Sequence, residues 1–238
     1  PNWSYALPSG GQVVTNNGTI TAGGKVMDIT GSGNVAIDWN SFNIAADEIV
    51  NFKNMQAVLN YVSGGSKSEI FGKLNGAGVN VFLVNPNGIL FGKTAQVNVG
   101  QLTASTRSLE KAALNSFNGS LSPLDAGGAA NVKADIINLG KLKAGKLVLE
   151  GNNLSIIGSD SLEVADKSKI TLRAGENINI GYEVTDKTTI DVGDGKGNTH
   201  QVSDYGKGGG DKASDVLSTA SVTDLKGRTK SINDAMLV

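Results

Sequence analysis

The sequence contains no cysteine among its 238 residues, so it forms no disulfide bond and offers no thiolate to a metal. A chain without thiols has nothing to mispair in an oxidising compartment, so this absence permits an extracellular location without establishing it. Long apolar runs are missing too. The longest, such as residues 81–84, are far shorter than the roughly 20 residues that cross a bilayer as a helix. We therefore expect no membrane insertion.

An excess of charge of either sign is also absent. The 21 Lys and Arg residues nearly balance the 22 Asp and Glu residues, which leaves a formal net charge of −1. Nucleic-acid binding draws on a basic surface that displaces counterions from phosphates, and this balance does not supply one. We therefore predict no nucleic-acid partner.

Proline is scarce, with 4 residues, whereas glycine is abundant, with 32, and Asn, Ser, Thr, Val and Ile are frequent. β-branched residues favour strands while Gly, Asn and Ser favour turns, so this composition predicts an all-β fold of many short strands. Aromatic residues are few and uneven: 10 of the 12 lie at or before Phe117. The later chain uses Leu, Ile and Val at its apolar positions, so the two halves are built differently.

The two ends of the sequence also lack features. The chain begins at Pro1 without an initiator methionine or a basic and apolar leader, so we expect that a signal peptide has been removed. It closes on Ala235-Met236-Leu237-Val238 with no capping element, and a stack of strands that ended there would expose its core. We expect the natural protein to continue beyond this point.

A regular pattern of apolar doublets is present within residues 131–192. In each doublet two apolar residues flank one other residue, so both side chains lie on the same face of a short strand. The doublets are Leu147/Leu149, Leu154/Ile156, Leu162/Val164, Ile170/Leu172 and Ile178/Ile180. Leu147 and Ile170 are 23 residues apart, and Leu154 and Ile178 are 24 apart. Every third doublet therefore recurs at nearly one interval, which indicates a repeat of three strands.

Turn residues such as Gly151-Asn152-Asn153 separate the doublets. Three short strands with turns between them are typical of one coil of a parallel β-helix, in which inward side chains stack about 4.8 Å apart. A β-sandwich is the alternative, but its strands are longer and return through hairpins about every 8 to 12 residues. The recurrence of the third doublet favours the parallel β-helix.

The remaining segments are less regular. Residues 11–44 contain strand-like stretches, and we expect the N-terminal part, with Trp3, Tyr5 and Trp39, to cap the open end of the stack. Residues 193–215 are rich in glycine and poor in apolar residues, which predicts a loop that leaves the stack. A helical spacing predicts a short helical turn within residues 51–61, on Phe52, Met55, Val58 and Leu59.

We expect one domain over residues 1–238. Residues 1–50 would form the cap and first coils, residues 51–130 further coils that carry a turn motif, and residues 131–192 the regular coils. Residues 193–238 would form the excursion and a last coil.

The turn motif lies within residues 80–92, which read as strand, turn and strand. In Asn85-Pro86-Asn87-Gly88, Asn can bond its own backbone at the first position, Pro presets φ at the second and Gly relaxes the fourth, as in a type I turn. From these residues alone the segment is a corner of one coil.

The same segment resembles the Asn-Pro-Asn-Gly-Ile signature of two-partner secretion proteins, the filamentous haemagglutinin family of Gram-negative adhesins. Five further stretches resemble that family, and they follow one another in the order that the family has. Together with the turn motif they cover roughly residues 6–110. They are Ala6-Leu7-Pro8-Ser9-Gly10-Gly11, Ile37-Asp38-Trp39-Asn40-Ser41-Phe42-Asn43-Ile44, Val50-Asn51-Phe52, Ser68-Glu69-Ile70-Phe71-Gly72-Lys73-Leu74 and Leu102-Thr103-Ala104-Ser105-Thr106.

The resemblance implies an N-terminal secretion domain that folds as a right-handed parallel β-helix with extra-helical β elements. It implies recognition by the POTRA domains of a partner outer-membrane β-barrel transporter, and a secreted or cell-surface adhesin whose missing C-terminal part binds a host or bacterial surface ligand. The expected secretion motif is Asn85, Pro86, Asn87, Gly88 and Ile89. We expect a monomer with no catalytic residue, cofactor or metal.

One departure concerns the branch of the family. A second family signature, Asn-Pro-Asn-Leu, is missing between Phe52 and Ile70, as in the shorter branch that resembles the high-molecular-weight adhesins. This puts the haemagglutinin and haemolysin branches in doubt, but not the family. Two roles of the turn stay open, namely a corner needed for folding, which every residue of it fits, and direct contact with the transporter.

The other motifs are better explained as ordinary structural segments than as functional sites. Residues 88–94 resemble a phosphate-binding loop, but they have three residues between the two glycines where that loop needs four. Residues 191–198 resemble a calcium loop but lack its alternating oxygen ligands. His200 lies in a polar stretch without the sequence context of a serine or cysteine nucleophile. A polysaccharide-active β-helix enzyme needs clustered acids. Here the acids are scattered, at Asp160, Glu163, Asp166 and Glu176. A stalk of a contact-dependent toxin or haemolysin shares every feature of the preferred interpretation.

Overall fold

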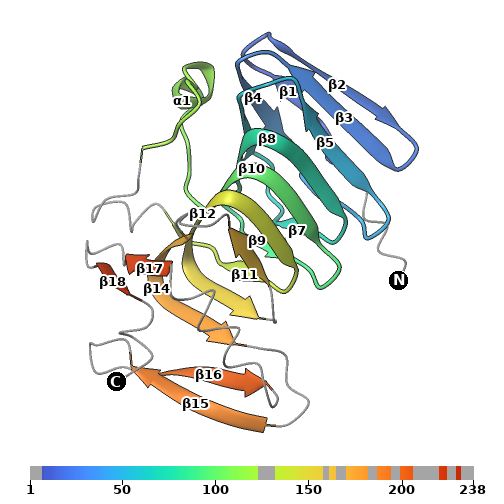
Figure 1. The fold of residues 1–238 in the computed structure, drawn as a ribbon. Helices are drawn as coiled ribbons and strands as arrows, with labels where there is room; N and C mark the ends of the chain where they lie inside the picture. The colour runs from blue at the N-terminus through green and yellow to red at the C-terminus, as the bar shows by residue number, and fades with distance from the viewer. Residues whose placement is uncertain are drawn as a thin grey trace.

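The computed structural model describes residues 7–122, 132–157, 161–164, 170–181, 187–193, 199–205, 220–223 and 229–231 (Figure 1). Nearly all of its elements are strands, and most of them pair in parallel with the strand one coil earlier. The result is a parallel β-solenoid of about six turns, which confirms the predicted all-β parallel β-helix. Among the described residues there is no helix with the length and apolar character needed to cross a membrane.

Each coil contributes strands to three faces. The first face stacks β3 (Val26–Gly31), β5 (Ile49–Lys53), the first halves of β8 (Lys73–Val84) and β10 (Gln96–Ser105), the start of β12 (Lys141–Ile157), and β13 (Leu162–Val164). The second face stacks β4 (Asn34–Trp39), β6 (Ala57–Val62), the second halves of β8 and β10, the middle of β12, the start of β14 (Ile170–Gly181), and β17 (Ala220–Thr223).

The third face consists of shorter strands. It stacks β7 (Ser68–Ile70), β9 (Ile89–Phe91), β11 (Ile136–Asn138), and the last parts of β12 and β14. The predicted repeat is confirmed here and on the second face, because Leu147 pairs with Ile170 and Leu154 pairs with Ile178. The third-doublet interval is therefore the length of one coil.

The core consists of columns of inward side chains between the three faces. One column on the second face runs through six buried aliphatic residues in register, Val35, Val58, Val81, Leu102, Leu147 and Ile170. Since one coil cannot bury its own inner face, each member of the column is covered by the members above and below it.

Antiparallel strands close the N-terminal end of the stack. β1 (Gln12–Val13) pairs with β4, and β2 (Gly18–Gly23) forms a hairpin with β3. The predicted cap is therefore present, but Trp39 lies inside the first coil, 1% exposed, rather than in the cap. Trp3 and Tyr5 lie outside the described residues.

The predicted helical turn within residues 51–61 is wrong. The segment forms β5 and β6, separated by a corner at which Asn54 has a φ of 59°. Phe52 at the end of β5, Met55 at the corner and Val58 in β6 are all buried in the main core, and Leu59 is buried on the outer side of β6. A corner between two strands therefore produced the spacing of a helix.

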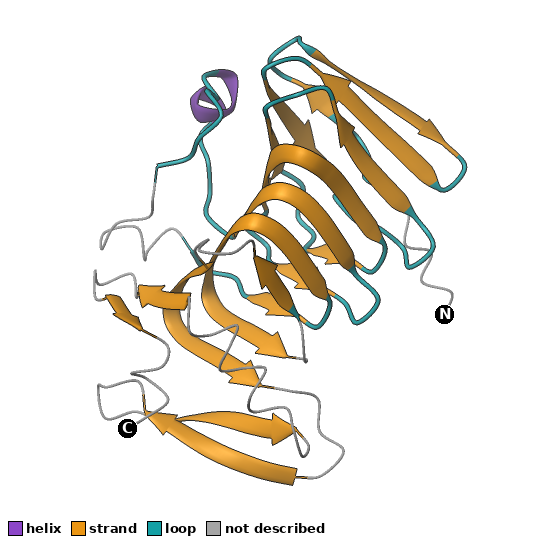
Figure 2. Cartoon of the chain, viewed as in Figure 1, coloured by secondary structure: helices purple, strands orange, loops and turns teal. Residues whose placement is uncertain are grey.

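A covering segment, residues 106–122, leaves the stack after β10 and contains the short helix α1 (Lys111–Asn115) (Figure 2). Leu114 and Phe117 pack on the outer side of the second face, and the rings of Phe117 and Phe82 meet edge to face at 5.4 Å. This second core contains Ala36, Ala57, Leu59, Val84, Leu114 and Phe117. No pattern in the sequence predicted this second core.

The C-terminal part combines further stack with excursions. β15 (Lys187–Gly193) and β16 (Thr199–Tyr205) form a separate antiparallel sheet, and β18 (Thr229–Ser231) pairs antiparallel with β17. Residues 193–215 were predicted to form a loop or an excursion from the stack. Residues 199–205 do leave the parallel stack, but as a strand of this separate sheet and not as a loop. The rest of that stretch and the chain end lie outside the described residues.

Candidate functional site

The Asn-Pro-Asn-Gly segment is a hydrogen-bonded turn between the second and third faces. The N–H of Gly88 donates to the carbonyl of Asn85 (3.1 Å), and the N–H of Asn87 donates to the side-chain Oδ1 of Asn85 (2.9 Å). Gly88 has a φ of 112°, a left-handed conformation that disfavours any side chain. The residue types thus follow from the geometry of the turn.

Asn85 holds three successive coils together. It is fully buried, and its Nδ2 donates to the carbonyl of Ser66 (3.0 Å) and to the hydroxyl of Ser68 (2.9 Å), both in the preceding coil. Its backbone N–H donates to the carbonyl of Ser105 in the following coil (2.9 Å). A side chain without a carboxamide at this position would leave buried polar groups of the preceding coil without a partner.

The other motif residues divide into buried and exposed ones. Ile89 is a core residue, 2% exposed, and its N–H donates to the carbonyl of Asp135 (3.1 Å). Asn87 is exposed, and its Nδ2 donates to the carbonyl of Gly64 (2.7 Å). Pro86 is half-buried beside it. The exposed part of the motif is therefore the Pro86-Asn87 tip.

A pocket of about 340 Å³ lies next to this tip. Its lining includes Ile137, which is 38% exposed, and Leu90, its half-buried register partner on the outer side of the third face. Lys67 at its rim forms an ion pair with Glu69 (2.9 Å). The complete lining is Lys67, Asn87, Gly88, Ile89, Leu90, Lys133, Ala134, Asp135 and Ile137.

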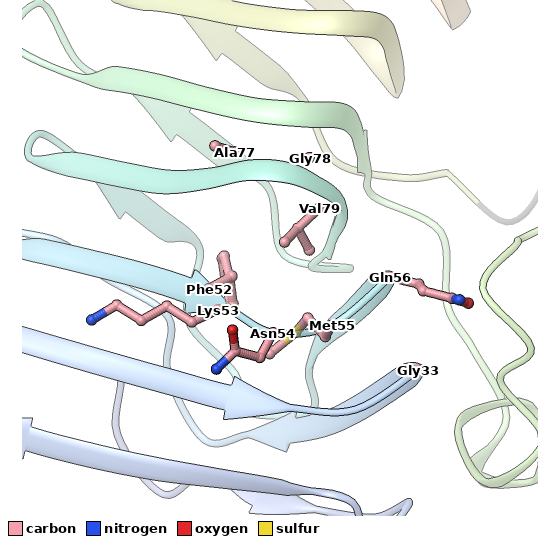
Figure 3. A pocket seen from close by; sticks show the side chains of 9 residues that line it. All are labelled: Gly33, Phe52, Lys53, Asn54, Met55, Gln56, Ala77, Gly78 and Val79. Atoms are coloured by element: carbon pink, nitrogen blue, oxygen red, sulfur yellow. The ribbon is translucent and has the colours of Figure 1, made fainter.

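A second pocket, of about 640 Å³, lies at the corner between the first and second faces (Figure 3). Phe52, Met55 and Val79 line it and are buried, whereas Lys53 and Gln56 extend away from it. Gly33, Asn54, Ala77 and Gly78 complete the lining. No acid or histidine lines it. In the part of the chain that the structure describes, no group of three or more His, Cys, Asp or Glu residues could hold a metal ion.

The remaining candidates do not converge on a site. The segment that resembles a phosphate loop is strand β9, followed by a turn in which Thr94 donates to the carbonyl of Phe71 (2.7 Å). Glu163 forms a surface ion pair with Lys143 (2.6 Å). His200 lies on strand β16. Asp160, Asp166 and much of the loop that resembles a calcium site lie outside the described residues.

Sequence reasoning missed a buried ion network on the second face. The guanidinium of Arg107 pairs with the carboxylate of Glu150, which is 1% exposed, and Arg173 donates to the other oxygen of that carboxylate (2.8 Å). Arg107 also donates to the hydroxyl of Ser105 (3.2 Å) and to the carbonyl of Ser122 (2.7 Å). The network therefore ties the covering segment to three coils. The only sequence signal is an isolated Glu at the end of an apolar strand.

A polar ladder occupies the outer side of the first face. Asn51 donates to Asp28 (2.9 Å), Asn75 donates to Asn51 (3.0 Å), and the Lys53 ammonium pairs with Asp28 (2.8 Å). The hydrogen bonds from Lys53 and Asn51 lower the pKa of the Asp28 carboxyl below its ordinary value. Any stability that this carboxylate adds is therefore present at neutral pH and lost as the pH falls through its folded pKa.

Comparisons with known proteins agree on one family. The model of the TPS secretion domain matches residues 4–235. The Heme/hemopexin-binding protein of Haemophilus influenzae strain KW20 Rd is 33% identical over 177 residues, which are 72% of this chain and 19% of that protein. A second Heme/hemopexin-binding protein of Haemophilus influenzae is 41% identical over 99 residues, which are 40% of this chain and 11% of that protein.

A solved structure, the crystal structure of the HMW1 secretion domain from Haemophilus influenzae, is 26% identical, with a TM-score of 0.49, and covers 74% of this chain and 56% of that one. The chain spans only about a fifth of the length of the first curated relative. Two-partner secretion exoproteins are exported and secreted, and such a domain implies a partner transporter in the outer membrane. Because the family model covers nearly the whole chain, this protein belongs to the TPS secretion domain family of two-partner secretion exoproteins.

Proposed function

We propose that this chain is the N-terminal, non-catalytic secretion domain of a large bacterial surface protein. The periplasmic POTRA domains of a partner outer-membrane β-barrel recognise the domain and pass it to the barrel. Outside the cell the domain folds first and offers each following segment an open strand edge on which to stack. Folding on the outer side then opposes return through the barrel.

The observation that carries this proposal is the position of Asn85. Its side chain bonds to the preceding coil and its backbone bonds to the following one, so the motif joins successive coils as the stack grows. The turn therefore supports a role in folding more strongly than a role as a contact point. Only the Pro86-Asn87 tip is exposed to a partner.

The ligand of the whole exoprotein belongs to the parts outside residues 1–238. We propose first that the whole exoprotein is a surface adhesin, because the sequence motifs resemble those of an adhesin family. The Heme/hemopexin-binding relatives favour a second kind of exoprotein, one that binds heme or hemopexin. A toxin or haemolysin stalk would use the same secretion domain. A polysaccharide-active enzyme has the least support, because Glu163 forms a surface pair with Lys143 and the buried carboxylate of Glu150 is paired with two arginines, so neither belongs to a catalytic pair of acids.

The test is a secretion assay with residues 1–238 behind a signal peptide, with and without the cognate transporter. We expect protein in the medium only with the transporter, and at least a tenfold loss for Asn85→Ala. Asn98→Ala, on an exposed residue of β10, is the matched control and should be secreted normally. Retention of the folded wild-type chain in the periplasm, beside a transporter that exports a known client, would contradict the proposal.

A further inference from the structure

The sequence contains four Asn-Gly pairs, and the structure describes all of them. In such a pair the backbone nitrogen of the glycine can attack the carboxamide carbon of the asparagine, because glycine has no Cβ that shields the nitrogen. The attack needs a backbone N–H and a carboxamide that other hydrogen bonds do not hold. The pairs are Asn17-Gly18, Asn75-Gly76, Asn87-Gly88 and Asn118-Gly119.

The carboxamides of Asn17 and Asn75 are held in place. The Nδ2 of Asn17 donates to the carbonyls of Ser32 (2.6 Å) and Asn34 (2.9 Å). Asn75 belongs to the polar ladder of the first face, where its Nδ2 donates to the Oδ1 of Asn51 (3.0 Å). It also lies within β8, where an extended backbone directs the side chain out of the sheet. Each carboxamide would have to break these bonds before it could turn onto the glycine that follows it.

In the Asn87-Gly88 pair both reacting groups are held. The Nδ2 of Asn87 donates to the carbonyl of Gly64 (2.7 Å), and the N–H of Gly88 donates to the carbonyl of Asn85 (3.1 Å). The nitrogen that would attack therefore already serves as a hydrogen-bond donor in the turn. Because Asn87 is exposed, its protection comes from these hydrogen bonds and not from burial.

Asn118 lacks the restraints that hold the other three asparagines. It is exposed and lies in the covering segment after α1, outside any helix or strand. Within the described residues, no hydrogen bond engages its carboxamide nitrogen or the N–H of Gly119. Its Oδ1 accepts the hydroxyl of Ser120 (2.9 Å) and the N–H of Ser120 (3.3 Å). Two donors on this oxygen stabilise the negative charge that it gains when the carboxamide carbon is attacked.

We infer that Asn118 is a site of self-modification, at which the backbone nitrogen of Gly119 displaces ammonia from the carboxamide. The nitrogen gives its proton to hydroxide and forms a bond to the carboxamide carbon. The bond from that carbon to the amide nitrogen then breaks, and ammonia leaves with a proton taken from water. Water opens the resulting cyclic imide at either carbonyl, which produces aspartate or isoaspartate. The whole reaction consumes one water and releases one ammonia, and it is independent of the proposed export function because it needs no partner.

The isoaspartate product loosens the covering segment. In isoaspartate the main chain passes through the former side chain and gains one methylene, next to Phe117, whose ring packs on Phe82 at 5.4 Å. The structure leaves little room for a longer chain, since even a Cβ on Gly119 would lie 2.6 Å from the Oδ1 of Asn34. Aspartate keeps the length of the main chain and an acceptor for Ser120. The reaction is therefore a slow and irreversible release of the segment that covers the outer apolar side of the second face.

The first test follows the four asparagines in purified residues 1–238 at mildly alkaline pH, by peptide mapping and mass spectrometry. We expect Asn118 to convert at least tenfold faster than Asn17, Asn75 and Asn87. In urea this preference should disappear, because glycine follows every one of them and only the folded structure distinguishes them. A rate at Asn118 no faster than at Asn87 in the folded protein, or an unchanged preference in urea, would overturn the inference.

The second test measures the release of the covering segment. The N–H of Phe117 donates to the carbonyl of Leu114 (3.2 Å), so amide hydrogen exchange at Phe117 reports on this segment. Exchange there should accelerate at least tenfold in the purified isoaspartyl form. Asn118→Asp, which adds the same charge without lengthening the main chain, is the matched control and should exchange like the wild type. Unchanged exchange in the isoaspartyl form, or equal acceleration in Asn118→Asp, would overturn the release.

Discussion

At the scale of single residues, the buried carboxylate of Glu150 has the largest expected effect on stability. It lies between Arg107 and Arg173 and is 1% exposed. Removal of one partner of a buried ion pair leaves the other charge without compensation, at a cost of about 3–5 kcal/mol. We therefore expect Glu150→Gln to lower the free energy of unfolding by that amount in urea denaturation.

A surface pair provides the control for this substitution. Glu163 pairs with Lys143, but both side chains are more than half exposed, at 62% and 56%. Exposed ion pairs contribute about 0–1 kcal/mol, so Glu163→Gln should hardly change the free energy of unfolding. Equal effects of the two substitutions would mean that the network around Glu150 is open to water.

At the scale of elements, the strands of adjacent coils approach one another closely at glycines on the corner between the first and second faces. A Cβ added to Gly100 would lie 2.7 Å from the carbonyl carbon of Gly78 in the preceding coil, and backbone cannot move aside cheaply. We expect Gly100→Ala to destabilise the protein by about 1–3 kcal/mol, because one or both strands must shift.

Thermal unfolding monitored by circular dichroism measures this effect. Gly65→Ala is the matched control, since a Cβ there would meet nothing within 4 Å and the φ of Gly65 is not left-handed. It should leave stability unchanged or raise it by up to about 1 kcal/mol. A Gly100→Ala variant as stable as the control would show that the corner is more open than the structure indicates.

Some strands and turns of the stack could be predicted from the sequence and others could not. Doublets such as Leu147/Leu149 face one interior and recur once per coil, so their period predicted the register of Leu147 with Ile170. The turn at Asn85 was also predictable, because its residue types follow from local backbone geometry. The same periodicity failed at residues 51–61, where a corner between two strands imitates the spacing of a helix.

Long-range contacts account for the rest. Arg107 and Glu150 are 43 residues apart, and neither has a local feature that identifies its partner. The covering segment was missed for the same reason. Leu114 and Phe117 have the three-residue spacing of a single helical turn, which is too short to identify a helix, and they are buried because Leu59 and Phe82 turn apolar side chains outward beneath them. The candidate motif was therefore predictable, but the network that supports the following coils was not.

At the scale of the whole molecule, the aliphatic columns run through the stack and connect its coils. Leu102 lies in the middle of one such column, between Val81 and Leu147, and is 1% exposed. Leu102→Ala would leave a cavity that costs about 2–5 kcal/mol. We expect amide hydrogen exchange to accelerate in β8 and β12 as well as in β10, because each coil is the template for its neighbours.

Thr103, the next residue on the same strand, supplies the control. Its side chain lies on the outer side of the second face and is only half-buried, so Thr103→Ala should leave exchange in β8 and β12 nearly unchanged. Acceleration confined to β10 in the Leu102 variant would mean that the coils are energetically independent.

The ion network around Glu150 bears on how the stack comes apart. In a solenoid whose repeats touch only their neighbours, unfolding can begin as fraying at an end and proceed coil by coil. Ser105, Glu150 and Arg173 lie in register on three consecutive coils. Arg107, in the covering segment, bonds to Ser105 and shares the Glu150 carboxylate with Arg173, so the last of these coils cannot peel away without exposing the charge of the second. This interaction gives the middle of the solenoid a cooperative block that is longer than one repeat.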